Sequence, residues 1–206
     1  MQKKGILIVV SGFSGAGKGT LMKKLVSEYE GYALSVSMTT RKPRENEIDG
    51  REYYFVSREK FEEVIASQGL IEYATYVENY YGTPVEYVEE ELKAGKDVLL
   101  EIEIQGALKV KEKFPSALLL FVMPPNIDEL KNRLKQRGTE SDEIINKRLK
   151  RAGEEAAGIE AYDYIVINDD LNECVKSLHQ IIAAAHLTPG RNALFIEEFR
   201  KELKQN

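Results

Sequence analysis

The sequence predicts an α/β protein with three layers, in which helices cover both faces of a parallel five-stranded core sheet. Short aliphatic runs without polar alternation recur along the chain, which is typical of strands buried on both faces. Stretches with apolar residues at helical spacing lie between these runs, so that strands and helices alternate. The first run, residues 6–10, leads directly into a glycine-rich turn and a helix, as strands of doubly wound sheets do.

Length and composition narrow the class further. The chain has 206 residues, 43% of them hydrophobic, which is enough for one domain with a substantial core. A net charge of -5 disfavours a nucleic-acid surface, and no segment has the ~20 apolar residues that cross a bilayer. The first apolar run is too short for a signal peptide, and the single Cys174 excludes an internal disulfide. We therefore expect a cytoplasmic protein without membrane or nucleic-acid partners.

Residues 12–20 predict a phosphate-binding loop. Its glycines let successive backbone N–H groups point at one anion, and the helix that begins near Lys18 adds its positive end. The loop matches the P-loop pattern except that Gly19 replaces the usual hydroxyl residue, which arrives one position later as Thr20. The alternative, a glycine-rich turn with a solvated lysine, leaves the strand before it and the helix after it unexplained. The candidate residues are Gly12, Ser14, Gly15, Ala16, Gly17, Lys18, Gly19 and Thr20.

A basic loop follows a second extended stretch at residues 32–37. Arg41 and Arg44 lie on either side of Pro43, which keeps the preceding residue out of a helix, so the loop presents both guanidinium groups together. A guanidinium fork suits a phosphate better than a lysine does. A solvated basic turn is the alternative, and the phosphate loop upstream favours the phosphate site.

Residues 45–84 predict a small insertion. Ser57 is expected to cap a short helix, and residues 70–81 have the composition of one extended aromatic stretch. Glu72 lies in that stretch, where a carboxylate can accept two parallel hydrogen bonds from the N1 and N2 edge of guanine, although the residue alone also fits a surface position. Tyrosines gather around it in a number too large for a dry core, at positions 53, 54, 73, 76, 80, 81 and 87.

Two carboxylates mark the end of the strand expected at residues 97–106. Glu101 and Glu103 are predicted to share one face of this strand at its carboxyl end, where parallel sheets bind ligands. Glu101 is placed to hold Mg²⁺, mainly through water, and Thr20 of the loop is the second candidate. The alternative is that both carboxylates only end the strand.

The carboxyl-terminal half predicts two more strands, a closing segment and a tail. The strands are expected at residues 117–123 and 162–167, with a helix at 126–138 between them. Residues 133–151 carry several arginines and few apolar anchors, which suits either a solvated face or a mobile lid over a phosphate site. Residues 191–206 predict an amphipathic helix docked on this body or on a neighbouring subunit.

Taken in order, the motifs resemble those of guanylate kinases over residues 6 to about 185. Each motif is weak alone, and their order makes the set specific. The motifs are Ser-Gly-Phe-Ser-Gly-Ala-Gly-Lys-Gly-Thr (11–20), Ser-x-x-Thr-Arg-x-x-Arg (37–44), Asp-Gly-x-x-Tyr-x-Phe-Val (49–56), Ile-Glu-Tyr-Ala (71–74), Asn-Tyr-Tyr-Gly-Thr (79–83), Glu-Ile-Glu-Ile-Gln-Gly (101–106), Arg-Gly-Thr-Glu (137–140) and Ile-Asn-Lys-Arg-Leu (145–149).

The resemblance implies a P-loop kinase that moves the terminal phosphoryl group of ATP to GMP in purine nucleotide metabolism, with Mg²⁺ as cofactor. It implies that Asn168 lies near the adenine of ATP, beside the loop residues and Arg137. It implies that Lys18, Arg41, Arg137 and Arg148 are catalytic. The residues that match binders of GMP are Ser37, Arg41, Arg44, Tyr53, Glu72, Tyr81, Thr83 and Glu103. Glu103 replaces the Asp that is usual in the family, Phe13 replaces the more frequent proline, and the resemblance gives no guide beyond residue 190.

The resemblance also implies how the chain is divided. Residues 1–190 would form one domain, followed by the tail 191–206, and ATP and GMP would bind to a monomer or homo-oligomer. Two alternatives remain: a non-catalytic module of the same fold that binds a phosphopeptide, and a P-loop kinase of a phosphorylated sugar. The first would have a degraded phosphate loop, and the second would not need Glu72 and Thr83. The implied parts are a core (1–36, 85–132 and 152–190), a GMP-binding insertion (37–84) and a lid (133–151).

Overall fold

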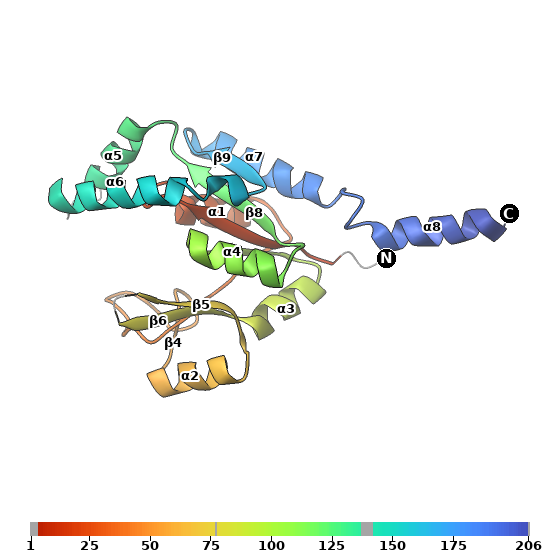
Figure 1. The fold of residues 1–206 in the computed structure, drawn as a ribbon, viewed down its shortest axis with the longest axis horizontal. Coiled ribbons are helices and arrows are strands. Elements are labelled where there is room, and N and C mark those ends of the chain that lie inside the picture. The colour runs from red at the N-terminus through yellow and green to blue at the C-terminus, as the bar shows by residue number, and fades with distance from the viewer. Residues whose placement is uncertain (1–3, 77, 137–141, 206) are drawn as a thin grey trace.

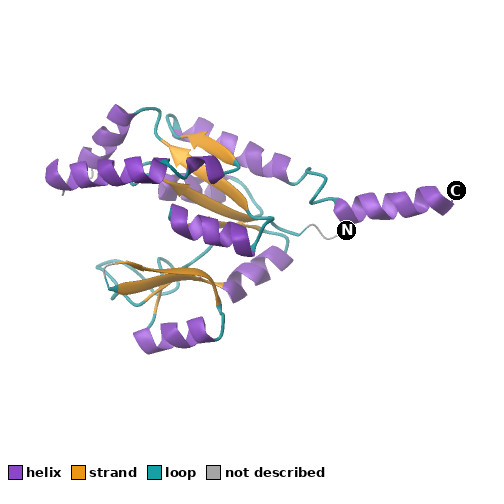
Figure 2. Cartoon of the chain, in the orientation of Figure 1, coloured by secondary structure: helices purple, strands orange, loops and turns teal. Residues whose placement is uncertain are grey.

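The computed structural model describes residues 4–76, 78–136 and 142–205. Within these ranges the chain forms two sheets surrounded by helices (Figure 1, Figure 2). The larger sheet has five strands in the order β2-β7-β1-β8-β9, each parallel to its neighbours, so the predicted α/β class is confirmed. Its strands are β1 (Leu7–Gly12), β2 (Tyr32–Leu34), β7 (Asp97–Glu101), β8 (Leu118–Met123) and β9 (Tyr164–Ile167).

Helices cover both faces of the larger sheet. Ile8 and Val9 point to opposite faces of β1, and both side chains are completely buried, which explains why the aliphatic runs lack polar alternation. Ile8 packs in a cluster with Leu178, whereas Val9 packs in a second cluster with Val110. The helices that supply these clusters are α1 (Lys18–Glu28) and α7 (Leu171–Ala185) on one face, and α3 (Val85–Lys93) and α4 (Ile104–Lys113) on the other.

The smaller sheet has the strand order β4-β3-β6-β5 and a small core of its own. Phe61 lies completely buried in this core, next to Met38 and Leu70. Ser57 caps the adjacent helix, as predicted, because its hydroxyl accepts a hydrogen bond from the backbone N–H of Lys60 at 3.1 Å. The elements are β3 (Met38–Thr39), β4 (Tyr54–Phe55), α2 (Arg58–Ala66), β5 (Leu70–Tyr76) and β6 (Asn79–Pro84).

The aromatic stretch at residues 70–81 forms two extended strands, as predicted, but these strands pair as a hairpin, which was not predicted. Strands β5 and β6 pair antiparallel, with Tyr76 opposite Asn79. The backbone of Glu78 has a φ of 66°, in the left-handed region that turns often use. Because neither glycine nor proline stands at this turn, Asn79 is its one turn-favouring residue and the local signal is weak.

The strand that begins at residue 97 ends at Glu101 instead of continuing to residue 106. Helix α4 starts at Ile104, and Glu103 is its N-cap residue. Glu101 and Glu103 therefore do not share a strand face, contrary to the prediction. The alternation of isoleucine and glutamate at residues 101–104 imitates a strand, while Ala107 and Val110 form the apolar face that packs α4 onto the sheet.

The arginine-rich segment is helical wherever the structure describes it. Within residues 133–151, Leu134 and Ile145 are buried in the same cluster as Leu130, so each of the two helices has an apolar anchor on the core. Arg137 lies outside the described residues. The helices are α5 (Ile127–Gln136) and α6 (Asp142–Ala156), followed by the 3₁₀ turn η1 (Ile159–Ala161).

The tail forms helix α8 (Ala193–Gln205), as predicted, and extends away from the body (Figure 1). Leu194, Phe195, Phe199 and Leu203 are each more than half exposed, so the expectation that the tail docks on its own body was wrong. Docking on a neighbouring subunit stays a prediction. In the part of the chain that the structure describes, no helix combines the length and apolar composition needed to cross a membrane.

Candidate active site

The glycine-rich loop between β1 and α1 lies at the carboxyl end of the larger sheet. Gly12 and Gly17 have φ angles of 152° and 86°, which favour glycine, and a Cβ atom at Gly12 would lie 2.2 Å from the backbone oxygen of Val122. The ammonium group of Lys18 donates to the backbone oxygens of Gly12 at 2.8 Å and Phe13 at 3.2 Å. It therefore lies over the loop, beside the helix N-terminus where an anionic phosphate is favoured.

Asn168, the residue that follows β9, packs against this loop. Its side-chain amide is buried and donates to the backbone oxygen of Ala16 at 2.8 Å. A Cβ atom at Gly17 would lie only 2.6 Å from the same amide nitrogen, so the two parts fit closely. Arg133 of α5 donates to the backbone oxygen of Asn168 at 2.9 Å and to Glu129 at 2.6 Å. The structure thus places Asn168 against the loop, and its nearness to adenine stays a prediction.

Helix α6 places two arginines at the cleft, of which Arg148 contacts the loop. Arg148 donates to the hydroxyl of Ser14 at 2.6 Å. One turn later, Arg151 pairs with both Glu103 of α4 and Glu155 of α6. Burial raises the pKa of Glu155, and the neighbouring Arg151 opposes that rise. Helix α6 is therefore tied by polar contacts to the loop and to the start of α4.

These groups line a cleft of about 700 Å³. One wall is the glycine-rich loop with Lys18, another is α6 with Arg148, and a third comes from the start of the smaller sheet. The third wall includes Ser37 and Tyr53, and Glu101 lies between the walls. The cleft therefore joins the predicted donor side to the predicted acceptor side.

The carboxylate of Glu72 lies in the smaller sheet and is 9% exposed. The hydroxyl of Thr83 donates to its Oε1 at 2.9 Å, and a Cβ atom at Gly106 of α4 would lie 3.2 Å from its Oε2. Burial raises the pKa of Glu72, while Thr83 and Lys109 act in the opposite direction. A buried carboxylate that accepts one hydroxyl hydrogen bond among the described residues is suited to accept further hydrogen bonds from a ligand.

Arg41 lies near aromatic rings of the smaller sheet. Its guanidinium carbon lies 5.5 Å from the ring centroid of Tyr53 and 5.7 Å from that of Phe55. The rings of Tyr53 and Tyr81 are themselves 5.9 Å apart in an edge-to-face arrangement. Tyr53 therefore connects the cleft to Arg41 and Tyr81, which do not belong to its lining in the described ranges.

The residues predicted to hold magnesium fit a metal that is bound chiefly by phosphate and water. A Cβ atom at Gly19 would lie 3.3 Å from Oε2 of Glu101, so this carboxylate lies directly beside the loop. Thr20 is exposed in the first turn of α1. Over the described residues, no group of three or more His, Cys, Asp or Glu side chains could hold a metal ion. The protein thus offers one nearby carboxylate and one hydroxyl, a sparse set that suits Mg²⁺ on a nucleotide.

Three contacts of the site were missed in the sequence. The sequence indicates Arg133 and Arg151 only as charges in a polar segment, and it gives no indication that Glu47 pairs with Arg41, which it does at 2.9 Å. The spacing of Glu129 and Arg133 predicts a pair on one helix face. The partners in other elements depend on the tertiary fold, so no sequence signal identifies them.

The fold and the cleft define a class of nucleotide-binding phosphotransferases. A glycine-rich loop lines one cleft together with Ser37 and Tyr53 at the start of the smaller sheet, and arginines from a third element reach the same cleft. The chain belongs to the guanylate kinase family, because the family model described as guanylate kinase matches residues 4–185.

Individual relatives agree with this assignment. The chain is 48% identical to a guanylate kinase of Latilactobacillus sakei, with 98% of each chain covered. It is 48% identical to a guanylate kinase of Bacillus subtilis, over 94% of this chain and 95% of the relative. The crystal structure of guanylate kinase from Anaplasma phagocytophilum matches with a TM-score of 0.74 and 34% identity, over 93% of this chain and 92% of the other.

Proposed function

We propose that this chain catalyses the reversible transfer of the terminal phosphoryl group of ATP to GMP, which gives ADP and GDP. One observation carries the proposal. A single cleft joins Lys18 on the glycine-rich loop to Ser37 and Tyr53 at the start of the smaller sheet. Two phosphorylated ligands that meet in one cleft can exchange a phosphoryl group directly.

GMP binds on the side of the smaller sheet. Glu72 accepts hydrogen bonds from N1 and N2 of guanine, and Thr83, which already donates to Glu72, orients the carboxylate. A ligand amidine edge supplies donors that a carboxylate in this setting otherwise lacks, which makes the pocket selective for guanine. The residues proposed to hold the GMP phosphate are Ser37, Arg41, Arg44, Tyr53 and Tyr81, with Glu103 at the mouth of the site.

ATP binds on the glycine-rich loop. Backbone N–H groups of residues 12–20 and the N-terminus of α1 hold its phosphates, and Lys18 moves from the loop carbonyls to the transferring phosphate. Asn168 holds the loop in shape near the adenine. Arg137 and Arg148 complete the positive charge around the transferring group.

Magnesium bound with ATP would supply further countercharge to the phosphates, and Glu101 and Thr20 would hold it mainly through water. The protein's own contribution is positioning and charge neutralisation. The migrating group carries spread negative charge and the GMP phosphate is already an oxyanion, so the transfer is in line and needs no covalent enzyme intermediate. Lys18, Arg41 and Arg148 stabilise that charge, and closure of α6 over the loop excludes water.

The division of the chain follows the same proposal. Residues 37–84 form the GMP-binding insertion, residues 133–151 form the lid, and residues 1–36, 85–132 and 152–190 form the core. Residues 191–206 form a separate tail. We place the reaction in purine nucleotide metabolism in the cytoplasm.

A coupled assay of ADP release from ATP tests the proposal. The acceptors are GMP, AMP, dGMP and ribose 5-phosphate, each tested with Mg²⁺. We expect rapid turnover with GMP and at least about 100-fold lower kcat/KM with AMP, because AMP presents no matching donor edge to Glu72. Turnover with ribose phosphate alone would identify a sugar-phosphate kinase, and tight GMP binding without turnover would identify a non-catalytic binding module.

A further inference from the structure

We infer that Glu47 is a positioning residue for the acceptor phosphate, because it fixes Arg41 and the backbone at Arg44 in one arrangement. The inference rests on the proposed function, which assigns the GMP phosphate to these two arginines. Glu47 itself need not touch GMP. Its effect on the reaction passes through the guanidinium group that it holds.

The two oxygens of one carboxylate make two different contacts. Oε1 of Glu47 accepts from Nη2 of Arg41 at 2.9 Å, and Oε2 accepts from the backbone N–H of Arg44 at 2.7 Å. The backbone N–H of Glu47 also donates to the carbonyl oxygen of Arg44 at 3.1 Å. The side chains of Arg41 and Glu47 are both only 16% exposed. The carboxylate therefore closes a loop that contains both arginines.

The contacts of Arg41 define the plane of its guanidinium group. Nη1 donates to the carbonyl oxygen of Lys42 at 2.8 Å, Nη2 donates to Glu47, and the group lies near the rings of Tyr53 and Phe55. A guanidinium has five N–H donors, so two such bonds orient it and still leave donors for a phosphate. Because fork geometry decides how well arginine binds phosphate, losing this orientation weakens GMP binding.

Because Glu47 is charged, the direction in which the KM for GMP changes when that charge is removed tests the inference. Hydrogen bonds from Arg41 and Arg44 hold the pKa of Glu47 below its ordinary value, so the carboxylate is ionised at neutral pH. An anion beside a phosphate site repels the ligand if it does nothing else. Removing the charge therefore lowers the KM for GMP if Glu47 only competes for Arg41, and raises it if Glu47 positions Arg41.

The decisive variant is Glu47→Gln, which keeps the shape of the side chain and removes its charge. Positioning predicts about a tenfold rise in the KM for GMP, with kcat within about threefold and the KM for ATP unchanged, as expected when one charge-assisted contact is lost. In an Arg41→Gln background, Glu47→Gln should add less than about twofold, because both residues then act through one group. The charge control is Glu63→Gln on α2, which removes an exposed ion pair with Lys60 and should leave every constant unchanged.

Three results would overturn the inference: a lower KM for GMP in Glu47→Gln, independent and multiplicative effects with Arg41→Gln, or equal losses for GMP and ATP. Thermal unfolding of each variant, matched to the unmodified chain, establishes that the loop change is local. If the unmodified chain itself does not phosphorylate GMP, the proposed function fails before any Glu47 variant is compared. Normal turnover of the unmodified chain together with an unaltered Glu47→Gln removes only the role of Glu47.

Discussion

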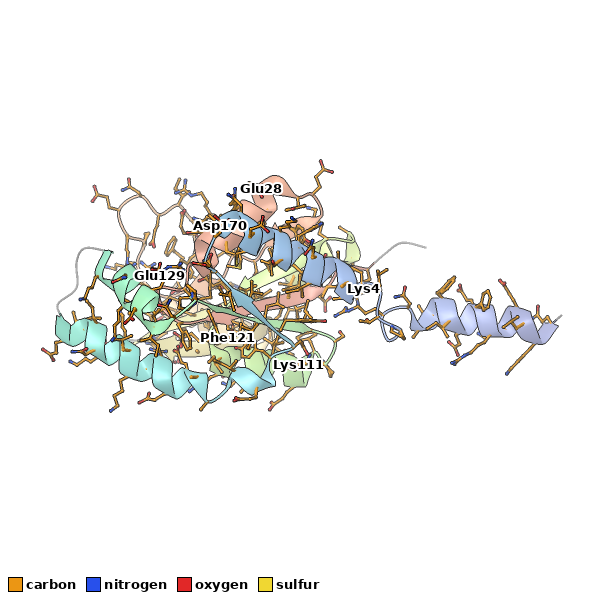
Figure 3. The ribbon with its side chains drawn as sticks, turned by 90° about the horizontal axis from the view of Figure 1, so that it is seen from above. Lys4, Glu28, Lys111, Phe121, Glu129 and Asp170 are labelled. Atoms are coloured by element: carbon orange, nitrogen blue, oxygen red, sulfur yellow. The ribbon has the colours of Figure 1, made fainter. Side chains whose placement is uncertain are left out.

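The two ends of the larger sheet use polar groups in opposite ways. At the carboxyl end, the glycine-rich loop and Glu101 line a cleft, and Asn168 is buried against the loop. At the amino end, Asp97 of β7 is buried and its contacts are all within the protein. In Figure 3, Glu129 of α5 and Lys4 lie apart, with Lys4 on the side from which α8 leaves.

Asp97 and Glu72, the acidic side chains buried within the described residues, make the contrast sharper. Asp97 accepts from the backbone N–H of Ile6 at 2.7 Å, and both of its oxygens lie 2.9 Å from Nε2 of His186. Among the described residues, the hydroxyl of Thr83 is the one donor at hydrogen-bond distance from Glu72. A satisfied carboxylate stabilises the fold, whereas an under-satisfied one is costly without a ligand and selective with one.

The largest expected effect is at the carboxyl end. We expect Lys18→Ala to lower kcat by about 10²–10³-fold, because it removes a charged donor from the transferring phosphate. Initial-rate assays measure this, and circular dichroism should show an unchanged fold. The control is Lys24→Ala on the same helix, whose ammonium pairs only with Glu28 among the contacts described. A Lys18→Ala variant with normal turnover would remove the glycine-rich loop from the mechanism.

The next largest effect is at the amino end. We expect His186→Ala to lower the free energy of unfolding by about 1–3 kcal/mol, because it leaves the buried Asp97 without its side-chain partner. Urea titration measures the loss, and kcat/KM for GMP should stay within about twofold. Lys176→Ala, an exposed substitution on the same helix, is the control. A lost activity with unaltered stability would contradict the division between the two ends.

Glu72→Gln should show that burying the ionised carboxylate of Glu72 lowers the free energy of unfolding. Burial raises the folded-state pKa of this carboxyl, so the folded state binds its proton more tightly than the unfolded state does. Stability is therefore expected to fall as the pH rises from the unfolded pKa through the raised folded pKa. We expect Glu72→Gln to remove this decline and to gain about 1 kcal/mol at neutral pH without GMP. Unfolding measured between pH 4 and 8 tests this, and a stability gain largest at the acid end would contradict it.

The smallest expected effect concerns the contact between α4 and α6. Arg151 and Glu103 form an exposed pair, so Arg151→Gln should change kcat/KM for GMP by only about two- to fivefold. Initial rates at low and high salt measure this change. Because salt screens exposed ion pairs, the difference in kcat/KM between the variant and the unmodified chain should be smaller at high salt. A loss as large as that of Lys18→Ala would mean that Arg151 touches the substrates.

Much of the fold was predictable because burial on both sides of a parallel sheet leaves a direct mark on the sequence. The aliphatic runs at β1 and β8 lack polar alternation, and each helix that packs on them repeats its apolar residues at helical spacing. The hairpin turn before Asn79 and the start of α4 at Ile104 were missed. Neither has a glycine or proline signal, and local alternation favoured a strand in both places.

The residues of the site could be predicted only where they lie close together in the sequence. The glycine-rich loop is local in sequence, so its residues and the role of Lys18 could be named directly. Glu72 could be named only as a candidate, because its burial depends on Thr83 and on Gly106 of α4, which lies far along the chain. Arg133 contacts Asn168, which only the tertiary fold brings near it. The partners of Glu47 are local, but the conformation of the loop that pairs Glu47 with Arg41 is not evident from the sequence pattern.

The most direct test of phosphoryl transfer in this cleft, with guanine read by Glu72, is the ratio of kcat/KM for GMP to that for AMP. The measurement compares the unmodified chain with Glu72→Gln at one pH and a saturating ATP concentration. We predict a ratio of at least about 100 for the unmodified chain and at least a tenfold fall in the variant, whose amide presents a donor to a donor. An unmodified chain that prefers AMP, or a ratio that Glu72→Gln leaves unaltered, would contradict this assignment.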